Sequence, residues 1–396
     1  MPHYHIADFK TPTLPQTVDG VTFHNIYKNN HENPDWIVDT TMGDKNFFIW
    51  IKSTDNGYLL KAEKATRPSP NFYLQQALKS FAKISEATVL ANNIPDVLKK
   101  EHLEDKNSSF KNIDFFAQNF PKAKDISIEV GFGSGRHLIH QALAQPDVLF
   151  IGIEIHKPSI EQVMKQIAIQ NIDNLLLLDY DARIFLEFVP SNSVKQIFVH
   201  FPVPWDKKPG RRVISETFIQ ESVRALKEDG TLELRTDSEN YFAYSLQTFL
   251  AANVIDMQVK KNLDAAITSK YEDRWRRQEK NIYDIIMQGG EVSPELKTLE
   301  AFSFPTLTVD HKSLTKLVGK TIKKEVGFIH FERIYFSTET NYVIRLSLGS
   351  FERPEHLYIK IDDNSVSYFP NAPVASQSNT LMHHELIKFI TGEEHG

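Results

Sequence analysis

The stretch that decides the fold is Ile126-Ser-Ile-Glu-Val-Gly-Phe-Gly-Ser-Gly-Arg-His137. A short apolar run leads into an acidic residue, and three glycines follow at alternate positions before an amphipathic segment. Glycines this close together are needed where the backbone turns sharply and no side chain can stand in the way. In α/β proteins, a strand, a glycine-rich turn and a helix N-terminus together hold a nucleotide-like ligand. The stretch therefore predicts a cofactor-binding turn.

Around this turn, residues 126–290 alternate between short apolar runs and longer amphipathic segments. We expect strands at 126–131, 148–154, 175–179, 194–201 and 230–236, and helices at 134–144, 158–170, 182–188, 213–227 and 239–252. Strands separated by helices of this length indicate parallel βαβ units. Right-handed crossovers place the C-terminal ends of such strands at one edge of the sheet. The predicted fold class is α/β, a Rossmann-like doubly wound sheet that binds its ligand at that edge.

Two segments flank this central part, and both are predicted to be small α+β domains. The expected boundaries are residues 1–110 for the N-terminal extension, 111–292 for the central domain and 293–396 for a β-rich C-terminal domain. In the first segment we expect a helix over 71–83, capped by Ser69 or Asn71, then a strand over 86–91 and a polar linker over 99–112. The last segment is expected to hold strands at 326–336, 341–348, 356–361 and 365–369 and a helix at 378–391.

The composition narrows the class of protein. The chain has 396 residues, of which 41% are hydrophobic, enough for two or three domains with packed cores. It has no cysteine, which excludes disulfides, thiolate-bound metals and a thiol nucleophile; no metal site is predicted. Without a bilayer-length apolar run or a signal-peptide pattern, a soluble cytoplasmic protein is expected. The net charge of −6 argues weakly against a nucleic-acid partner, but the middle of the chain is locally basic.

Acidic residues follow the first three expected strands of the central part. A carboxylate at Glu154 can accept hydrogen bonds from ribose hydroxyls, and one at Asp181 can accept a bond from an adenine amino group. Glu129 would repel a pyrophosphate but suits an ammonium or a cationic sulfur. Singly, Glu154 could be a solvated strand-end acid and Asp181 a helix cap; in combination they predict S-adenosylmethionine. The predicted cofactor-binding residues are Glu129, Gly131, Gly133, Gly135, Glu154 and Asp181.

The fourth expected strand ends in a stiff, basic loop. Its sequence is Phe201-Pro-Val-Pro-Trp-Asp-Lys-Lys208, and two arginines follow at 211 and 212. Two prolines around one residue restrict the backbone, and an indole beside basic side chains suits a base next to a phosphate backbone. A second basic and aromatic stretch, 270–280, is expected to contact a nucleic-acid backbone. The alternative for both stretches is a solvated surface, with the acids of 270–280 pairing with its arginines.

These motifs resemble the bacterial tRNA (guanine-N7)-methyltransferase family over about residues 120–288. The matching blocks are Glu129–Gly135, Phe150–His156, Asp181–Ala182, Phe201–Lys208 with Arg211–Arg212, Leu234–Tyr241, Thr268–Glu272 and Asn281–Asp284. The resemblance implies a class I methyltransferase fold and an enzyme that uses S-adenosylmethionine. The implied reaction is methyl transfer to N7 of guanosine 46 in the variable loop of tRNA, with tRNA as the partner.

The resemblance also implies the roles of individual side chains. Lys207 and Asp237 are the expected catalytic residues. The family usually has Asp where this chain has Val203. Guanine N7 carries no proton, so positioning dominates the transfer, and Asp237 is expected to stabilise the charge that develops on the base. The implied substrate-binding residues are Lys207, Arg211, Arg212, Asp237, Ser269, Lys270, Tyr271 and Glu272.

Two other functions stay open from the sequence. Val203 motivates a methyltransferase-fold protein that binds tRNA with weak or lost activity. A nucleotide-dependent oxidoreductase is disfavoured by Glu129 and by the loop with its two prolines. We hypothesise that the two end segments help to grip tRNA, although residues 326–333 match an RNA-binding strand pattern only weakly. No protein partner is predicted, and the oligomeric state is not readable from the residues.

Overall fold

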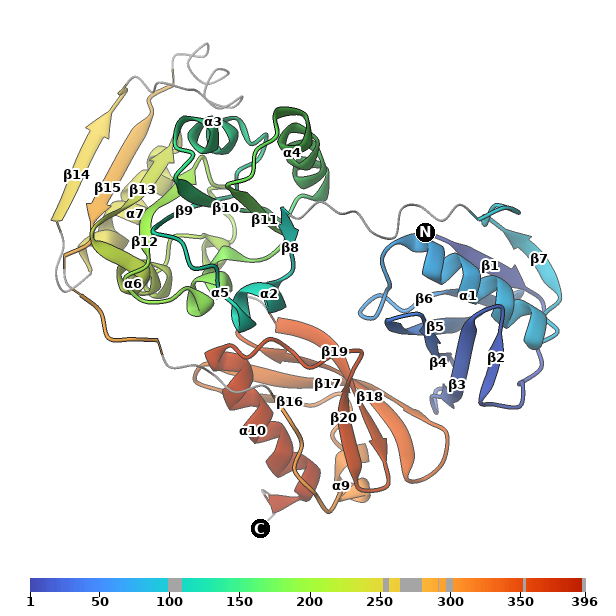
Figure 1. The fold of residues 1–396 in the computed structure, drawn as a ribbon. Helices are drawn as coiled ribbons and strands as arrows, with labels where there is room; N and C mark the ends of the chain where they lie inside the picture. Colours follow the sequence, from blue (N-terminus) through green and yellow to red (C-terminus); the bar gives the residue numbers. More distant parts are fainter. Residues whose placement is uncertain are drawn as a thin grey trace. The chain divides into compact units, whose positions relative to one another are not determined.

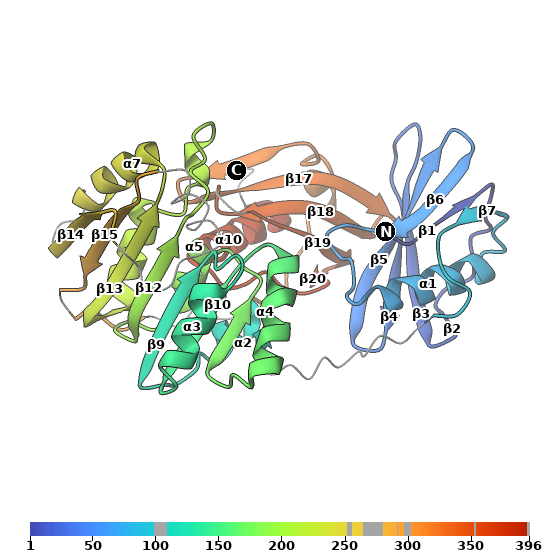
Figure 2. The same ribbon diagram turned by 90° about the horizontal axis from the view of Figure 1, so that it is seen from above.

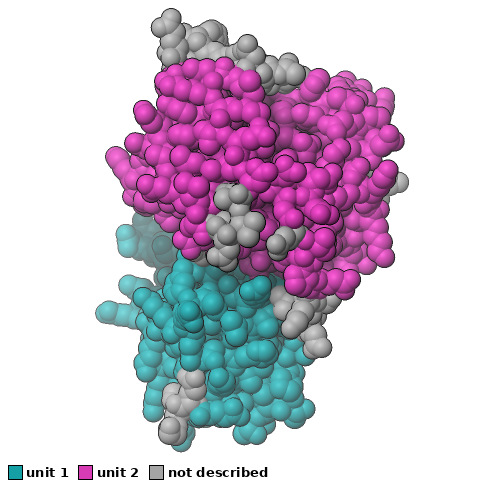
Figure 3. All heavy atoms as spheres, turned by 90° about the vertical axis from the view of Figure 1, so that its left-hand side faces the viewer, with its two compact units in different colours: residues 1–105, 300–396 teal, residues 106–299 magenta. Residues whose placement is uncertain are grey.

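The computed structural model describes residues 1–98, 109–251, 256–263, 280–290, 292–296, 302–351 and 354–393. The chain divides into two compact units, one of residues 106–299 and one that joins residues 1–105 with 300–396 (Figure 3). Within the described ranges, every helix is too short or too polar to cross a membrane.

The unit of residues 106–299 is built on an eight-stranded sheet in the order β14-β15-β13-β12-β9-β10-β11-β8 (Figure 1). The strands from β8 to β13 pair in parallel, whereas β15 runs antiparallel to β13 and to β14. The strands are β8 (Phe110–Lys111), β9 (Asp125–Val130), β10 (Val148–Ile153), β11 (Leu175–Leu178), β12 (Val194–His200), β13 (Leu226–Thr236), β14 (Asp256–Lys261) and β15 (Tyr283–Gln288).

Helices pack on both faces of this sheet (Figure 2). One core lies under α3 and α4, where Leu138 and Val163 meet Phe150 of β10. The other lies under α5, α6 and α7, where Phe218 and Tyr241 pack with Ile197 of β12. The helices are α2 (Ile113–Gln118), α3 (Arg136–Ala144), α4 (Lys157–Gln170), α5 (Ala182–Phe185), α6 (Glu216–Ala225) and α7 (Glu239–Leu250).

The predicted fold class is confirmed, with differences at the edges of the sheet. The five expected parallel strands form, but β8, β14 and β15 were not predicted as strands. β15 joins because Ile285 and Met287 bury their side chains in the core. The helix expected over 213–227 is shorter at both ends, because Ser215 caps it at its start and β13 already begins at Leu226. The helix expected over 182–188 ends at Phe185 and continues as a 3₁₀ turn.

The order of the strands locates a ligand crevice. The chain passes from β9 outward through β10 to β11, and then returns to the other side of β9 to form β12. In open α/β sheets, ligands bind beyond the C-terminal ends of the strands at such a reversal. The glycine-rich turn follows β9, and the loop with two prolines follows β12. Both motifs therefore stand at this crevice.

The second unit is a twelve-stranded sheet within the described residues, in the order β20-β19-β18-β17-β3-β4-β5-β6-β1-β7, with β16 on β17 and β2 on β3. Its N-terminal strands are β1 (His3–Ile6), β2 (Gln16–Val18), β3 (Val21–Lys28), β4 (Trp36–Met42), β5 (Lys45–Thr54), β6 (Gly57–Ala62) and β7 (Val89–Asn92). Its C-terminal strands are β16 (Thr321–Lys324), β17 (Gly327–Phe336), β18 (Asn341–Gly349), β19 (Pro354–Asp362) and β20 (Ser365–Phe369). Its helices are α1 (Asn71–Ile84), α9 (His311–Thr315) and α10 (Gln377–Thr391).

The two ends of the chain, expected as separate extensions, share this sheet and part of a core. Phe336 of β17 pairs with Lys28 of β3, and Phe48 stacks on Phe369 at 4.1 Å between ring centres. Buried side chains of both ends, including Tyr358, pack around this stack. Residues 1–105 and 300–396 thus form one compact unit. The division into three domains at 110 and 292 stays a prediction.

Local predictions in this unit were met in part. The helix over 71–83 is confirmed as α1, but its N-cap is Pro70 rather than Ser69 or Asn71. The strand expected over 86–91 begins three residues later and ends one residue later, as β7. Residues 99–108 of the expected linker lie outside the described residues, and residues 110–111 form β8. β16 and α9 were not predicted.

Candidate functional site

The glycine-rich turn after β9 has the conformation that its sequence predicts. Gly131, Gly133 and Gly135 have φ angles of 69°, 52° and 70°, a region that residues with a Cβ rarely adopt. A Cβ added to Gly131 would meet nothing within 4 Å, and one added to Gly133 would meet only a backbone oxygen at 4.0 Å. A Cβ on Gly135 would lie 2.3 Å from Cγ2 of Val163 in α4. The first two glycines therefore border open space, and the third packs the turn onto the protein.

Glu129, at the end of β9, is buried and pairs with a histidine that the sequence did not single out. Its carboxylate, 3% exposed, accepts a hydrogen bond from Nδ1 of His137 at 2.8 Å. Burial lowers the pKa of His137, but the hydrogen bond and charge of Glu129 outweigh it, so the net pKa is raised. His137 lies on the first turn of α3, and its Nε2 contacts Gln141. The charge of Glu129 is thus compensated inside the protein.

A second pair of the same kind lies beside it. Nε2 of His200, the last residue of β12, is 2.9 Å from Oε1 of Glu233 on β13. The rings of His137 and His200 are 4.6 Å apart. Burial raises the pKa of Glu233, but the hydrogen bond from His200 and nearby positive charges outweigh it and lower the pKa overall. Two carboxylates and two histidines, from β9, α3, β12 and β13, therefore lie together.

Glu154, directly after β10, faces the glycine-rich turn. Its Oε2 accepts a hydrogen bond from the backbone N–H of Gly133 at 2.9 Å. Its Oε1 accepts bonds from the N–H groups of Ile155 and His156 at 2.8 and 2.9 Å. Because a carboxylate offers about four acceptor positions, these three bonds leave room for a hydroxyl. Glu154 was expected to accept hydrogen bonds from ribose hydroxyls, and its carboxylate can still accept one further hydrogen bond.

Asp181 has the cap role that the sequence left open as its alternative. Its Oδ1 accepts a hydrogen bond from the N–H of Arg183 at 3.0 Å at the start of α5. The guanidinium of Arg183 also donates to both carboxylate oxygens, at 3.1 and 2.9 Å. An adenine amino group would therefore share this carboxylate with Arg183.

The loop after β12 is held in an unusual backbone conformation. Phe201 and Trp205, on either side of the two prolines, have φ angles of 50° and 47°. Bulky residues rarely adopt positive φ, and such strain persists where the surrounding structure enforces it. Val203 between them is 59% exposed. Lys207 is exposed, and the guanidinium of the exposed Arg211 lies 5.1 Å from the Trp205 ring centre.

Arg212 has a different position from the one expected for a substrate contact. Only 9% of it is exposed. Its Nε donates to the carbonyl of Pro204 at 2.8 Å, and its guanidinium lies 4.3 Å from the ring centre of Tyr244 in α7. A planar guanidinium suits such a stacked, bonded site. Arg212 therefore anchors the loop to α7, and its role in substrate binding stays a prediction.

Asp237 lies at the same edge of the sheet, directly after β13. Its Oδ2 is 3.0 Å from Nζ of Lys280, and 19% of its side chain is exposed. Ser238 follows and caps α7 through the N–H of Tyr241. The predicted substrate residues Ser269, Lys270, Tyr271 and Glu272 lie outside the described residues.

The sheet thus gathers the predicted residues at the ends of neighbouring strands. Four neighbouring strands of the sheet are in the order β10, β9, β12 and β13. At or just beyond the C-terminal ends of these strands lie, in the same order, Glu154, Glu129, the loop after β12 and Asp237. The open backbone over Gly131 and Gly133, with an acid on either side, fits a cofactor without phosphates. These residues therefore suit S-adenosylmethionine.

Comparison with known proteins gives the same result. A family model described as "Putative methyltransferase" matches residues 123–285. A protein of Wolinella succinogenes named tRNA (guanine-N(7)-)-methyltransferase is 38% identical over 99% of this chain and 100% of its own length. Proteins with the same name from Campylobacter jejuni and Helicobacter hepaticus are 37% and 35% identical, over 98% and 99% of this chain and 98% and 100% of their own lengths.

The similarity includes both end segments as well as the central unit, because each of these alignments spans almost the whole chain. It therefore covers more than residues 120–288, from which the resemblance was inferred. The chain belongs to the tRNA (guanine-N(7)-)-methyltransferase family, which confirms the predictions of an enzyme, of the family and of S-adenosylmethionine as the cofactor.

Proposed function

We propose that this enzyme transfers the methyl group of S-adenosylmethionine to N7 of guanosine 46 in the variable loop of tRNA, and that it does so in the cytoplasm. One observation carries the proposal. An open glycine-rich turn and a carboxylate, Asp237, lie at the same edge of the sheet in a chain that aligns end to end with relatives named for this chemistry.

On the cofactor side, three carboxylates would each bind a different part of S-adenosylmethionine. Glu154 would accept a ribose hydroxyl with its remaining acceptor position. Glu129 would face the cationic methionine end, and His137 holds its carboxylate in one orientation. Asp181 would face the adenine, sharing its oxygens with Arg183. When bound, S-adenosylmethionine supplies a methyl group on a positively charged sulfur.

On the substrate side, no proton has to be removed. Guanine N7 has an in-plane lone pair and no hydrogen, so the protein has to align the base with the methyl group. Methylation leaves positive charge on the base, and a fixed carboxylate nearby stabilises that charge as it develops. Asp237 is that carboxylate in our proposal. Lys280, its present partner, would share Asp237 with the bound base.

The loop after β12 would complete the substrate pocket. Val203 would provide an apolar wall and a backbone carbonyl, because its side chain carries no charge and is exposed. Lys207 and Arg211 are exposed on the same loop, and they would contact tRNA phosphates. Residues 269–272 stay part of the proposed substrate site. Val203 also motivates the alternative, a protein that binds tRNA with little activity.

The test is a single substitution with a matched control. Asp237→Asn should lower kcat about a hundredfold or more, the size of effect seen when one group that stabilises transition-state charge is removed. Its affinity for S-adenosylmethionine should stay within about twofold, because the cofactor groups are untouched. Glu239→Gln removes an exposed carboxylate two residues away and should leave kcat unchanged.

Three outcomes would contradict parts of the proposal. Near-normal turnover by Asp237→Asn would remove Asp237 from the mechanism. Equal methylation of a tRNA with adenosine at position 46, mapped by cleavage at 7-methylguanosine, would refute the position. Tight tRNA binding without any methyl transfer by the natural protein would favour the alternative function.

A further inference from the structure

We propose that one face of the C-terminal sheet, formed by β16 to β19, is a second tRNA-binding surface. On this face an unstacked base would lie against Phe351 and Phe328, and backbone phosphates would lie along Lys323 of β16 and the exposed Lys316 and Lys320 of the segment before it. The inference rests on the proposed function in one respect, namely that tRNA is the substrate.

The surface is an open groove with a volume of about 570 Å³. Its lining residues are Thr321, Phe328, His330, Glu332, Ser347, Pro354 and His356. Successive residues of a strand point to opposite faces, and Ile329 and Phe331 of β17 pack with Met382 of α10. Phe328 and His330 therefore point away from α10. The groove is the face of the sheet that the helix leaves uncovered.

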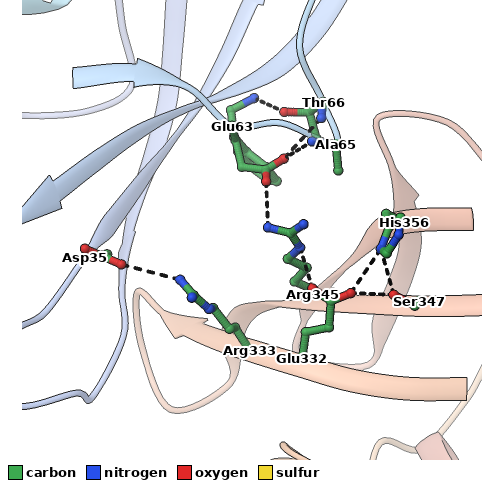
Figure 4. Close-up of polar contacts among 10 residues, drawn as sticks. Asp35, Glu63, Ala65, Thr66, Glu332, Arg333, Arg345, Ser347 and His356 are labelled. Atoms are coloured by element: carbon green, nitrogen blue, oxygen red, sulfur yellow. Dashed lines mark hydrogen bonds and ion pairs between the residues drawn. The ribbon is translucent and has the colours of Figure 1, made fainter. Parts of the chain in front are cut away.

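The far end of the same face is covered by the N-terminal strands. There Val343 and Tyr358 pack with Phe48 of β5. Ion pairs between the N-terminal segment and the C-terminal sheet lie at the edge of this covered part (Figure 4). Arg345 of β18 lies 2.9 Å from Glu63 of the N-terminal segment and 2.7 Å from Glu332 in the groove. One half of this face is thus used to join the two ends of the chain, and the other half is open.

The open half presents aromatic rings and fixed polar groups. Phe351 is 49% exposed and stacks on Phe328, with 5.7 Å between ring centres and 26° between planes. Nδ1 of His356 lies 2.7 Å from Oγ of Ser347, and Nδ1 of His330 lies 2.8 Å from Oγ1 of Thr321. Proteins read single-stranded RNA by stacking bases on exposed aromatic rings beside hydrogen-bonding groups. The groove offers both features.

The edge strand beside the groove, β16, and the segment that leads into it are rich in lysine. Residues 311–324 contain five lysines and no acidic residue, although the whole chain has a net charge of −6. Lys316, Lys320 and Lys323 are exposed. β16 pairs with β17 so that Lys323 is opposite Phe328, which places Lys323 on the groove face. Lys324, by contrast, pairs with Glu385 of α10 on the other face. The acidic Glu332 in the groove is compensated by Arg345 and by the hydrogen bond with His356. Such a rim matches the phosphates of a nucleic acid.

The test measures tRNA binding by the full-length protein across a series of salt concentrations. In K316Q/K320Q/K323Q, affinity should fall about tenfold or more. The slope of log K against log salt should become shallower by about 2, since each phosphate contact contributes about 0.7–0.9. KM for tRNA should rise in proportion, while kcat at saturating tRNA and the affinity for S-adenosylmethionine stay unchanged. Phe351→Ala should weaken binding about fivefold to tenfold without changing the slope, because stacking involves no counterion.

The matched control is K28Q/K52Q/K64Q, which removes three exposed lysines of the N-terminal segment and should keep the natural affinity and slope. The proposed tRNA-binding surface would be overturned if the two triple variants lost tRNA affinity equally. It would also be overturned if the slope of log K against log salt were unchanged in K316Q/K320Q/K323Q. A loss of tRNA binding in that variant, together with no methylation by the natural protein, would support the surface and overturn the proposed function instead.

Discussion

Replacing Gly135 by alanine should destabilise the central unit because the added methyl group has no room. The residue has a φ of 70°, and its new Cβ would lie 2.3 Å from Cγ2 of Val163. A residue with a Cβ in the left-handed region costs about 1–2 kcal/mol, and forcing an extra carbon into a packed site costs about 1–3 kcal/mol more. The expected loss in the free energy of unfolding is therefore about 2–5 kcal/mol.

Two further variants separate the steric contribution from the backbone contribution to this loss in the free energy of unfolding. Val163→Ala removes the clashing methyl groups, so the double variant should be more stable than the sum of the single effects by about 1–3 kcal/mol. Gly133→Ala has the same backbone cost, about 1–2 kcal/mol, but its Cβ enters open space. That space is where the cofactor is proposed to lie. Gly133→Ala should therefore weaken S-adenosylmethionine binding about tenfold or more.

The assay is hydrogen exchange along a urea series, followed in peptides of residues 131–170, because the chain has two compact units and a single unfolding curve would mix them. Cofactor affinity is measured on the same proteins by calorimetry. Equal stability losses for Gly133→Ala and Gly135→Ala, or additive effects of Gly135→Ala and Val163→Ala, would refute the packing argument.

Three further predictions follow from the charged side chains. Glu129 raises the pKa of His137 above 6.5, so the stabilisation from this pair is fully present below pH 6.5. The difference in stability between the natural protein and His137→Gln should shrink as the pH rises through the folded pKa of His137. Equal differences at low and high pH would contradict this. Arg345→Met should lower the free energy of unfolding of its own unit by about 3 kcal/mol, because it leaves Glu63, 3% exposed, without its cation; the measurement is hydrogen exchange along the same urea series in peptides of residues 341–349, and Arg345→Lys should recover part of the loss. A histidine hydrogen bond lowers the pKa of Glu332 to about 2, so its contribution is present above 4.5 and is lost as pH falls toward 2; acid unfolding of Glu332→Gln, followed by circular dichroism, should lack this dependence.

Local patterns in the sequence were enough to predict the centre of this protein. The alternation of strands and helices and the turn at residues 131–135 depend on contacts between near neighbours, on apolar periodicity and on a backbone that only glycine adopts easily. The positions of Glu129, Glu154 and Asp237 followed, because parallel strands end at one edge of a sheet. The family followed from the same short motifs.

Interactions between distant residues were decided only by the tertiary structure. No spacing in the sequence shows that His137 compensates the charge of Glu129, or that Arg212 is buried against Tyr244. Arg212 looked like Arg211 in sequence, because exposure depends on what packs against a side chain rather than on its neighbours in the chain. The cap formed by Asp181 is local, but its competition with a cofactor role had to be judged from the position of Arg183.

The largest difference between the fold expected from the sequence and the observed fold lies at the two ends of the chain. Their strands were expected in part, yet their union in one sheet was not, because it depends on contacts such as the ion pair between Glu63 and Arg345, 282 residues apart. Strand pairing requires only free backbone groups and a matching apolar face, and many strands of a sequence satisfy both. Which of them meet is determined by the whole fold, and here that choice left half of one sheet face open.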